Sequence, residues 1–500
     1  MQIQKNYNRY TFSIVYVVFC FAILFYMHGL IDNKPIVSDA VQNLRMAYHL
    51  YNSGVLSNEN DTTVVPEPTN YREPIPPIVT AAFIALHPGL NKVTLQSLQS
   101  GEHTKKIKQV DLFWILLLLI GVGFLSYSVT ANKWVPFLAL FFILIYFIRF
   151  GGHFGTLFTE LPAAALIIWS SYFLLIAVKW ERLFIYFIAG LSLGLLILIK
   201  AVFYYLFLVL LLVFIFGGTS EKKPVKVGLL FFGAFIVVGP WLIRNYYIYG
   251  EVGITQRGGV VLYQRAEHNM MTKEEVNGAI YLWGPEIYRS IVRDSFLGFK
   301  ESDFESGGKL VRLNRDLESD SAAVDDGRPE LAESFFNKSR AEVNRLQTEM
   351  GRDGQEASRR DVYNFLQGEA KEMILNHPVR HVLMSPVFLW RGIWCFPNST
   401  IPLFPDTLQR YLHDVVNLLA YLSLWSFFIF GLIKFDRIYM ALTILPVLML
   451  LFHAGATHNI PRFSDPAIPS MLICLSILFF YVIRKSYNNL FTTLAKKRTE

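Results

Sequence analysis

Residues 183–216 read LFIYFIAGLSLGLLILIKAVFYYLFLVLLLVFIF, an apolar stretch in which Lys200 is the one charged side chain. A helix that crosses a bilayer needs roughly 20 apolar residues, so this stretch accommodates two neighbouring helices with Lys200 between them. Comparable apolar runs recur along the chain, at about 11–31, 111–130, 134–149, 157–178, 183–199, 201–216, 226–248, 411–433, 438–456 and 465–483. The pattern predicts an all-α polytopic membrane protein with about 10–12 transmembrane helices.

The composition supports the same class of protein. Of the 500 residues, 53% are hydrophobic and only 17% are charged, whereas a soluble chain of this length carries more surface charge. These figures exclude a soluble enzyme and a disordered protein. Cys20, Cys395 and Cys474 have no paired spacing, which excludes a disulfide-stapled module and a zinc site. The net charge of +7 is typical of a membrane protein with basic residues at its cytoplasmic face, so we expect no nucleic-acid partner.

The charges between the apolar runs predict an orientation. Basic residues gather in alternate short loops, for example at Lys133, Arg182 and Lys223. By the positive-inside rule, these loops and both termini are cytoplasmic. The chain then divides into three parts. An N-terminal transmembrane module covers 1–248, with an outer loop at 32–110, and an outer domain covers 249–410. A C-terminal transmembrane segment with a cytoplasmic tail covers 411–500.

Further helices are expected outside the spans. Residues 39–52 contain no helix breaker, and residues 78–87 are apolar, which predicts juxtamembrane helices in the first outer loop. Residues 330–376 are rich in good helix formers, so the outer domain is expected to be helical. The apolar segment 381–396 is short and contains Pro386, and we interpret it as an interfacial helix.

Two acidic residues lie at the predicted outer face, close to the ends of spans. Asp39 follows the first span, and Glu160 lies at the start of the span at 157–178. A carboxylate there can take a proton from an acceptor group or hold a metal ion. Both acids also have an ordinary interpretation, because acids often cap or begin helices. His153, in the glycine-rich segment before Glu160, is a further candidate, although a lone histidine is more often structural.

Basic side chains are predicted on the same side of the membrane. Tyr71 and Arg72 precede the rigid segment Pro74-Ile75-Pro76-Pro77, and a guanidinium in a fixed place suits a phosphate. Arg72 has an ordinary alternative as the partner of Glu73. The other cations at the outer boundary are Lys200, Arg244 and Arg462. Each could merely extend to the membrane interface, but together they suit a lipid phosphate.

The order of these motifs resembles that of the GT-C integral-membrane glycosyltransferases, in particular the family 39 branch with the protein O-mannosyltransferases and the aminoarabinose transferases. The resemblance covers roughly 10–250 and 440–484. The matching motifs are Asp39 in the first outer loop, Pro76-Pro77, Thr159-Glu160, Pro240-Trp241-x-x-Arg244-Asn245 and Pro461-Arg462-Phe463-x-x-Pro466-x-x-Pro469. Two departures are Ala40, where many relatives have a second acid, and Phe463, where tyrosine is usual.

The resemblance implies an inverting transfer of a sugar from a polyprenyl-phosphate donor to a glycan, lipid or protein acceptor. Asp39 would be the general base, and Glu160 the second acid of the site. Arg72, Arg244 and Arg462 would lie near the donor phosphate. A divalent metal ion near Asp39 and Glu160 is compatible with this mechanism but not required by it. The implied location is the bacterial inner membrane, with the site at the outer face among membrane lipids.

Two other functions remain open. A polysaccharide polymerase or ligase also uses lipid-linked glycans, and there Arg380, His381 and Arg391 of the outer domain would matter more than Asp39. A transporter or lipid flippase would place ionisable groups near the middle of the bilayer and would show paired halves. The charges of this chain lie mainly at one boundary, and no halves repeat, so the transferase is the preferred hypothesis.

Overall fold

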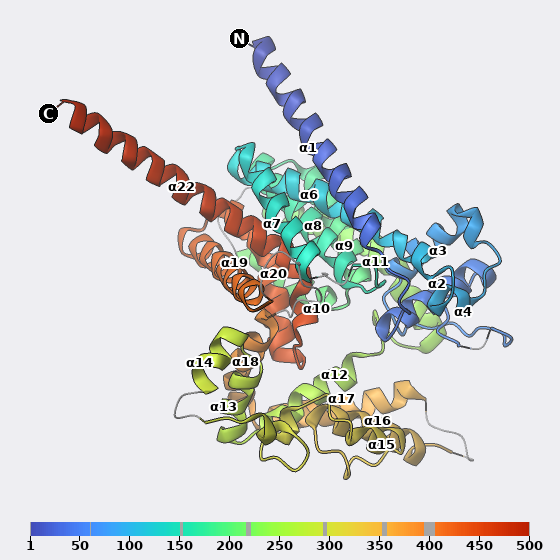
Figure 1. The fold of residues 1–500 in the computed structure, drawn as a ribbon. Helices are drawn as coiled ribbons and strands as arrows, with labels where there is room; N and C mark the ends of the chain where they lie inside the picture. The colour runs from blue at the N-terminus through green and yellow to red at the C-terminus, as the bar shows by residue number, and fades with distance from the viewer. Residues whose placement is uncertain are drawn as a thin grey trace.

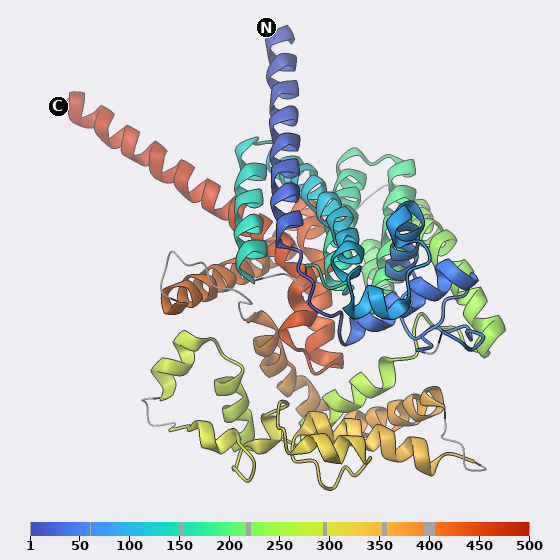
Figure 2. The ribbon, with the colours of Figure 1, turned by 45° about the vertical axis from the view of Figure 1, so that its right-hand side comes forward.

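The computed structural model describes residues 2–60, 62–150, 154–216, 222–293, 298–352, 358–394 and 406–499. The elements assigned in these ranges are all helices. A bundle of long helices forms one part of the molecule, and α12 to α17 form a layer across one end of it (Figure 1). Both ends of the chain point away from that layer (Figures 1 and 2).

The bundle consists of helices that coincide with the predicted apolar runs. They are α1 (Gln2–Leu30), α6 (Asp111–Thr130), α7 (Trp134–Phe150), α8 (Glu160–Trp180), α9 (Leu183–Ile199), α10 (Val202–Phe216), α11 (Lys223–Tyr249), α19 (Asp406–Lys434), α20 (Arg437–Ala456) and α22 (Ile468–Thr499). Within the described residues, six helices are long and apolar enough to cross a membrane: Thr104–Thr130, Glu160–Trp180, Lys223–Tyr249, Tyr411–Lys434, Arg437–Ala456 and Pro461–Ser486. The other expected spans fall on shorter apolar helices, Ile14–Leu30, Trp134–Tyr146, Leu183–Ile199 and Val202–Ile215. The predicted all-α polytopic fold is confirmed.

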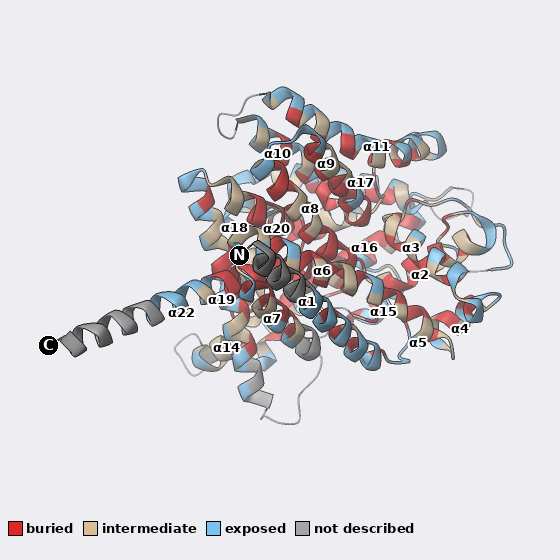
Figure 3. Ribbon diagram, turned by 90° about the horizontal axis from the view of Figure 1, so that it is seen from above, coloured by how far each residue is buried: buried red, intermediate tan, exposed pale blue. Residues whose placement is uncertain are grey.

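Helix α8 occupies the centre of the bundle. In the most apolar stretch of α8, 78% of the residues are buried, whereas the corresponding share for the peripheral helix Tyr411–Lys434 is 33%. Its neighbours are α6, α9 and α20, and a hydrogen bond of 2.8 Å joins Ser170 of α8 to Ser192 of α9. Seen from the end of the bundle, buried residues fill the middle, and exposed ones line outward helices such as α11 (Figure 3). Glu160, the first residue of α8, therefore lies inside the protein.

Helices α9 and α11 pack closely because glycines face each other across their interface. A Cβ atom on Gly190 would lie 2.2 Å from the carbonyl oxygen of Leu230, and one on Gly233 would lie 2.4 Å from that of Phe187. Small residues at such positions let two membrane helices approach through their backbones. The contact fixes α9 and therefore the position of Lys200, which follows its last residue.

The first outer loop carries the predicted juxtamembrane helices. They are α2 (Asp39–Ser53) and α3 (Ile75–Leu86), and two short helices that were not predicted follow them, α4 (Leu95–Ser100) and α5 (Thr104–Ile107). Helix α2 confirms the prediction for 39–52, and it ends at Gly54 in the left-handed conformation. Helix α3 begins earlier than predicted, because prolines in its first turn have a backbone angle already suited to a helix start.

The predicted outer domain is helical, as expected. Its helices are α12 (Gly258–Glu267), α13 (Lys273–Leu282), α14 (Glu286–Arg293), α15 (Asp320–Asp325), α16 (Phe335–Glu349), α17 (Arg359–Asn376) and α18 (Pro378–Ile393). The helix-rich stretch at 330–376 contains two helices, α16 and α17. Helix α18 covers most of the segment interpreted as interfacial and contains Pro386. The remaining short helices are α21 (Pro461–Ser464) and 3-10 turns at Pro88–Leu90, Lys108–Val110, His268–Met270, Glu301–Phe304, Val311–Leu313 and Asp465–Ala467.

A buried arginine attaches this domain to the bundle. Arg265 of α12 is fully buried and donates hydrogen bonds to the carbonyl oxygens of Ala454 (3.1 Å) and His381 (2.9 Å). Ala454 belongs to the last turn of α20, and His381 belongs to α18. Leaving such a buried donor without an acceptor is costly, so these bonds hold α12 against the end of α20.

Candidate functional site

A cavity of about 390 Å³ lies where α2, α8, α10, α12 and α20 meet. Most of the polar residues predicted from the sequence line it, namely Asp39, Tyr71, Arg72, Glu160, Lys200 and Arg462. They come from segments that are far apart in the chain: Asp39 and Arg462 are separated by 423 positions. The sequence predicts only that these side chains lie on one side of the membrane. In the structure, several of them are in direct contact.

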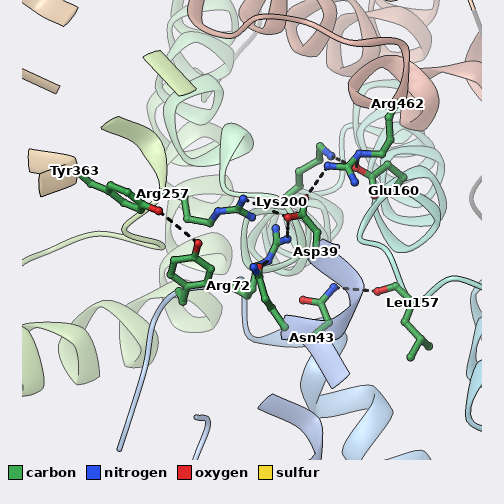
Figure 4. A network of polar contacts seen from close by, with 11 residues as sticks. Asp39, Asn43, Arg72, Leu157, Glu160, Lys200, Arg257, Tyr363 and Arg462 are labelled. Carbon is green, nitrogen blue, oxygen red and sulfur yellow. Dashed lines mark hydrogen bonds and ion pairs between the residues drawn. The ribbon is translucent and has the colours of Figure 1, made fainter. Parts of the chain in front are cut away.

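Three arginines surround the carboxylate of Asp39 (Figure 4). Arg72 Nη2 lies 2.5 Å from Oδ1, Arg257 Nη2 lies 3.2 Å from Oδ1, and Arg462 Nη2 lies 2.7 Å from Oδ2. The side chain of Arg72 is only 8% exposed, and its Nε donates a hydrogen bond of 2.7 Å to Gln42 Oε1. Helix α2 thus presents Asp39 to guanidinium groups from three separate segments.

These contacts determine the protonation state of Asp39. Burial alone would raise the pKa of its carboxyl group, but the charges of Arg72 and Arg257, a hydrogen bond from Arg72 and the charge of Arg462 together hold that pKa well below its usual value. Asp39 is therefore ionised at every ordinary pH. A carboxylate with so low a pKa is a weak proton acceptor, so it can serve as a general base only after these cations have been drawn elsewhere.

Arg462 also links Asp39 to the second predicted acid. Its Nε lies 3.6 Å from Glu160 Oε1, and Lys200 Nζ lies 3.4 Å from the same oxygen. The metal ion considered from the sequence would have to lie near both acids, but the guanidinium of Arg462 occupies the place between them. Among the residues that the structure describes, no group of three or more His, Cys, Asp or Glu side chains is arranged to hold a metal ion. The described residues offer no complete ligand set for a divalent cation here, and a metal ion near Asp39 and Glu160 stays a prediction.

Lys200 enters the cavity because the apolar stretch breaks there. Its backbone is extended (φ −145°, ψ 106°) between α9 and α10. Glu73 supports this break, since its Oε1 accepts a hydrogen bond of 3.1 Å from the backbone nitrogen of Ala201. Glu73 therefore bonds the backbone here, whereas Arg72, its possible partner from the sequence, reaches Asp39.

Arg257 was missed by the sequence analysis. It directly precedes α12, and its guanidinium lies 5.2 Å from the ring centroid of Tyr71, whose hydroxyl is 3.5 Å from that of Tyr363. A Cβ atom on Gly259 would lie 1.9 Å from the carbonyl oxygen of Tyr363, so this glycine lets α12 approach α17 closely. No local pattern in the sequence distinguishes Arg257 from the other charged residues of its segment.

A second missed residue is His453 of α20. It is buried at the wall of the cavity, and its ring stacks on that of Phe463 at 5.1 Å. None of the described residues hydrogen-bonds its Nε2. His453 lies inside an apolar run, where a histidine has no sequence feature that distinguishes a ligand contact from a core residue.

One predicted site residue, Arg244, does not line the observed cavity. Arg244 points away from it: its Nη2 donates to the carbonyl oxygen of Thr69 (3.2 Å), and its guanidinium lies 4.5 Å from the ring of Trp241. Arg244 therefore braces the loop that leads to Tyr71 and does not line the cavity itself. His153 lies outside the described residues.

Apolar side chains form another part of the cavity lining. Val202 and Tyr205 of α10, Leu262 of α12 and Phe452 of α20 line it. The rings of Tyr205 and Phe452 stack at 5.8 Å, and Tyr205 is 56% exposed at the outside of the bundle. The lining thus combines a charged cluster with apolar side chains, of which Tyr205 reaches the outside of the bundle.

Comparison with known proteins identifies no family. No family model and no curated protein sequence matches the chain. Among solved structures it is similar to the archaeal oligosaccharyltransferase AglB from Archaeoglobus fulgidus, determined in complex with an inhibitory peptide and a dolichol-phosphate. The identity is 12% and the TM-score 0.48, over 97% of this chain and 52% of AglB, so the chain spans about half the length of that protein. A similarity this distant does not transfer an activity.

Proposed function

We propose that the chain is a membrane glycosyltransferase that moves a sugar from a polyprenyl-phosphate donor to an acceptor at the outer face of a bacterial inner membrane. The observation that supports this most is the convergence of Arg72, Arg257 and Arg462 on Asp39 inside one cavity. With Lys200 included, the basic side chains outnumber the acidic ones there. The cavity is therefore suited to an added anion.

A phosphate diester fits the charged cluster. Guanidinium groups bind phosphate oxygens through paired, charge-assisted hydrogen bonds. A donor phosphate would compete with Asp39 for Arg72, Arg257 and Arg462. The prenyl chain would then follow the apolar part of the lining past Tyr205 and Phe452 into the lipid.

This competition supplies the change that Asp39 needs to act as a base. When the arginines turn to the phosphate, the carboxylate loses the charges that depress its pKa and becomes a better proton acceptor. The acceptor hydroxyl or amine attacks the anomeric carbon and gives its proton to Asp39. The bond from that carbon to the phosphate oxygen breaks, and the electron pair leaves with the lipid phosphate, whose growing charge Arg72, Arg462 and Lys200 stabilise.

No specific observation favours the alternative functions. Arg380, His381 and Arg391, which a polymerase or ligase would use, donate to or contact the backbone carbonyls of Met271, Gly455 and His458. None of the three lines the cavity. A transporter is also less well supported, because the charged cluster lies at one end of α8, α10 and α20 and not near their middle.

The test is a transfer assay combined with glycan analysis. Mass spectrometry of cells without the gene should show an outer-face glycan, lipid or protein lacking one sugar, with the corresponding polyprenyl-phosphate sugar accumulating. The purified protein should then transfer that sugar in vitro, and the Arg72→Gln variant should not. Unpolymerised or unattached lipid-linked repeats would instead indicate a polymerase or ligase. If no glycan or lipid-linked sugar changed, the proposal would be wrong.

A further inference from the structure

A second cavity, of about 190 Å³, lies at the opposite end of the same helices. Helices α8, α10 and α20 line both cavities, α8 through Glu160 at one end and Val178 at the other. The 18 steps from Glu160 to Val178, at about 1.5 Å each, span about 27 Å, close to the roughly 30 Å of a bilayer hydrocarbon core. If these helices cross the membrane, the second cavity would lie at the interface opposite the candidate active site.

The wall of this cavity is mainly apolar. Leu174 of α8, Val213 of α10 and Ile444 of α20 contribute to it, together with Phe435 in the turn between α19 and α20. Leu432 and Phe435 are exposed on the outside of the bundle beside it. A wall of this kind offers little to a free inorganic anion, whose whole surface is polar, but it suits a hydrocarbon chain.

Basic side chains form its polar edge. Lys223, Lys226 and Arg437 all line the cavity. Lys226 Nζ lies 3.4 Å from Glu181 Oε2, and Arg437 Nη1 lies 3.3 Å from Glu181 Oε1. Glu181 is half exposed and contacts both. Among the described residues that line the cavity, three are basic and none is acidic. The side chain of Lys226 is only 8% exposed, which places its charge beside the apolar wall.

We propose that this cavity binds one anionic phospholipid from the leaflet opposite the candidate active site. The headgroup phosphate would contact Lys226 and Arg437, with Lys223 nearby, and part of an acyl chain would lie against the apolar wall. Basic pockets between membrane helices suit anionic headgroups in this way. The inference is independent of the proposed function, because it uses none of the residues of the first cavity.

Native mass spectrometry of the full-length protein tests this binding directly, with phosphatidylglycerol and phosphatidylcholine as the two probes. The wild-type chain should retain one phosphatidylglycerol at concentrations where it retains no phosphatidylcholine. Replacing both charges (Lys226→Met with Arg437→Met) should weaken retention by about 10-fold or more. Equal retention of both lipids, or unchanged binding in the double variant, would overturn the proposal.

Two further variants separate lipid binding from misfolding. Lys434→Ala removes a basic residue that is exposed on the same face but does not line the cavity, so phosphatidylglycerol should bind it as it binds the wild type. Val213→Trp leaves every charge in place and fills the apolar wall, and it should lose the lipid while still eluting as a folded protein in gel filtration. Displacement of the lipid by inorganic phosphate alone would show that the site takes a soluble anion, and it would refute the lipid assignment.

Discussion

The variant Asp39→Asn removes one negative charge and changes the shape of the site very little. In the wild type, guanidinium nitrogens of Arg72, Arg257 and Arg462 lie 2.5, 3.2 and 2.7 Å from the carboxylate. Removing one partner of a buried ion pair costs roughly 3–5 kcal/mol, because the other charge stays buried without compensation. Asp39 is 19% exposed and asparagine still accepts hydrogen bonds. We therefore expect a loss of about 3 kcal/mol in the free energy of unfolding.

The same variant should respond unusually to a ligand. A bound polyprenyl phosphate supplies the negative charge that the substituted side chain lacks, so it should bind the variant more tightly than the wild type and restore much of the lost stability. Sugar transfer should nevertheless fall by about 100- to 10,000-fold, since the general base is gone. Tighter binding of polyprenyl phosphate together with slower sugar transfer distinguishes this mechanism from simple damage to the site.

The assay compares thermal unfolding of both proteins in detergent, with and without polyprenyl phosphate, and then their transfer rates. Neutral polyprenol is the control ligand, because it has the same chain without the charge. Equal stability of the two proteins without ligand, or equal stabilisation by polyprenol and polyprenyl phosphate, would refute the idea that phosphate and Asp39 compete for the arginines. Near-normal transfer by the variant would refute Asp39 as the base.

Four further outcomes are expected. Arg257→Gln should raise the KM for the donor by about 10- to 100-fold, whereas Arg244→Gln, outside the cavity, should leave it within a few-fold in steady-state assays. In the pH profile of kcat/KM, which reports the free enzyme, we expect no loss of activity from protonation of Asp39 above about pH 4, because the arginines depress its pKa. In the profile of kcat, which reports the enzyme with donor bound, we expect such a loss at acidic pH, because the donor phosphate draws the arginines away from Asp39. The same loss in both profiles would contradict this. Burial raises the pKa of Glu267 from 4.5 to about 8. Between these pH values the folded protein holds a proton that the unfolded chain releases, so the free energy of unfolding should fall as pH rises. Glu267→Gln should abolish this pH dependence of stability in thermal unfolding curves. Gly190→Leu should destabilise the bundle by about 1–3 kcal/mol in denaturant unfolding, because its side chain meets the α11 backbone.

Hydropathy predicted the helices of the bundle well, because lipid and the protein interior both require apolar side chains and internal backbone hydrogen bonds. The orientation rule placed Asp39, Glu160 and Arg462 on one side, and the structure brings them together. The rule does not predict toward which side of its helix a side chain points. Arg244 and Asn245 are neighbours on α11, and it is Asn245 that is buried, while Arg244 turns to the loop at Thr69.

Neither hydropathy nor the orientation rule could identify Arg257 as a site residue. It lies in a hydrophilic segment with many other charges, and neither periodicity nor membrane boundary selects one of them. Its position depends on how the outer domain folds back against α17, where Gly259 permits the close approach. Contacts of this kind are set by tertiary packing, which a local pattern does not encode.

The three arginines around Asp39 occupy positions 72, 257 and 462 of the 500-residue chain. During synthesis they leave the ribosome at widely separated times, and domains generally fold from the N-terminus onward. Asp39 and Arg72 emerge early, but the cluster is complete only after nearly the whole chain has been made. Under the function proposed above, a truncated product without Arg462 would have at most two guanidinium groups at Asp39 and would offer a donor phosphate an incomplete site.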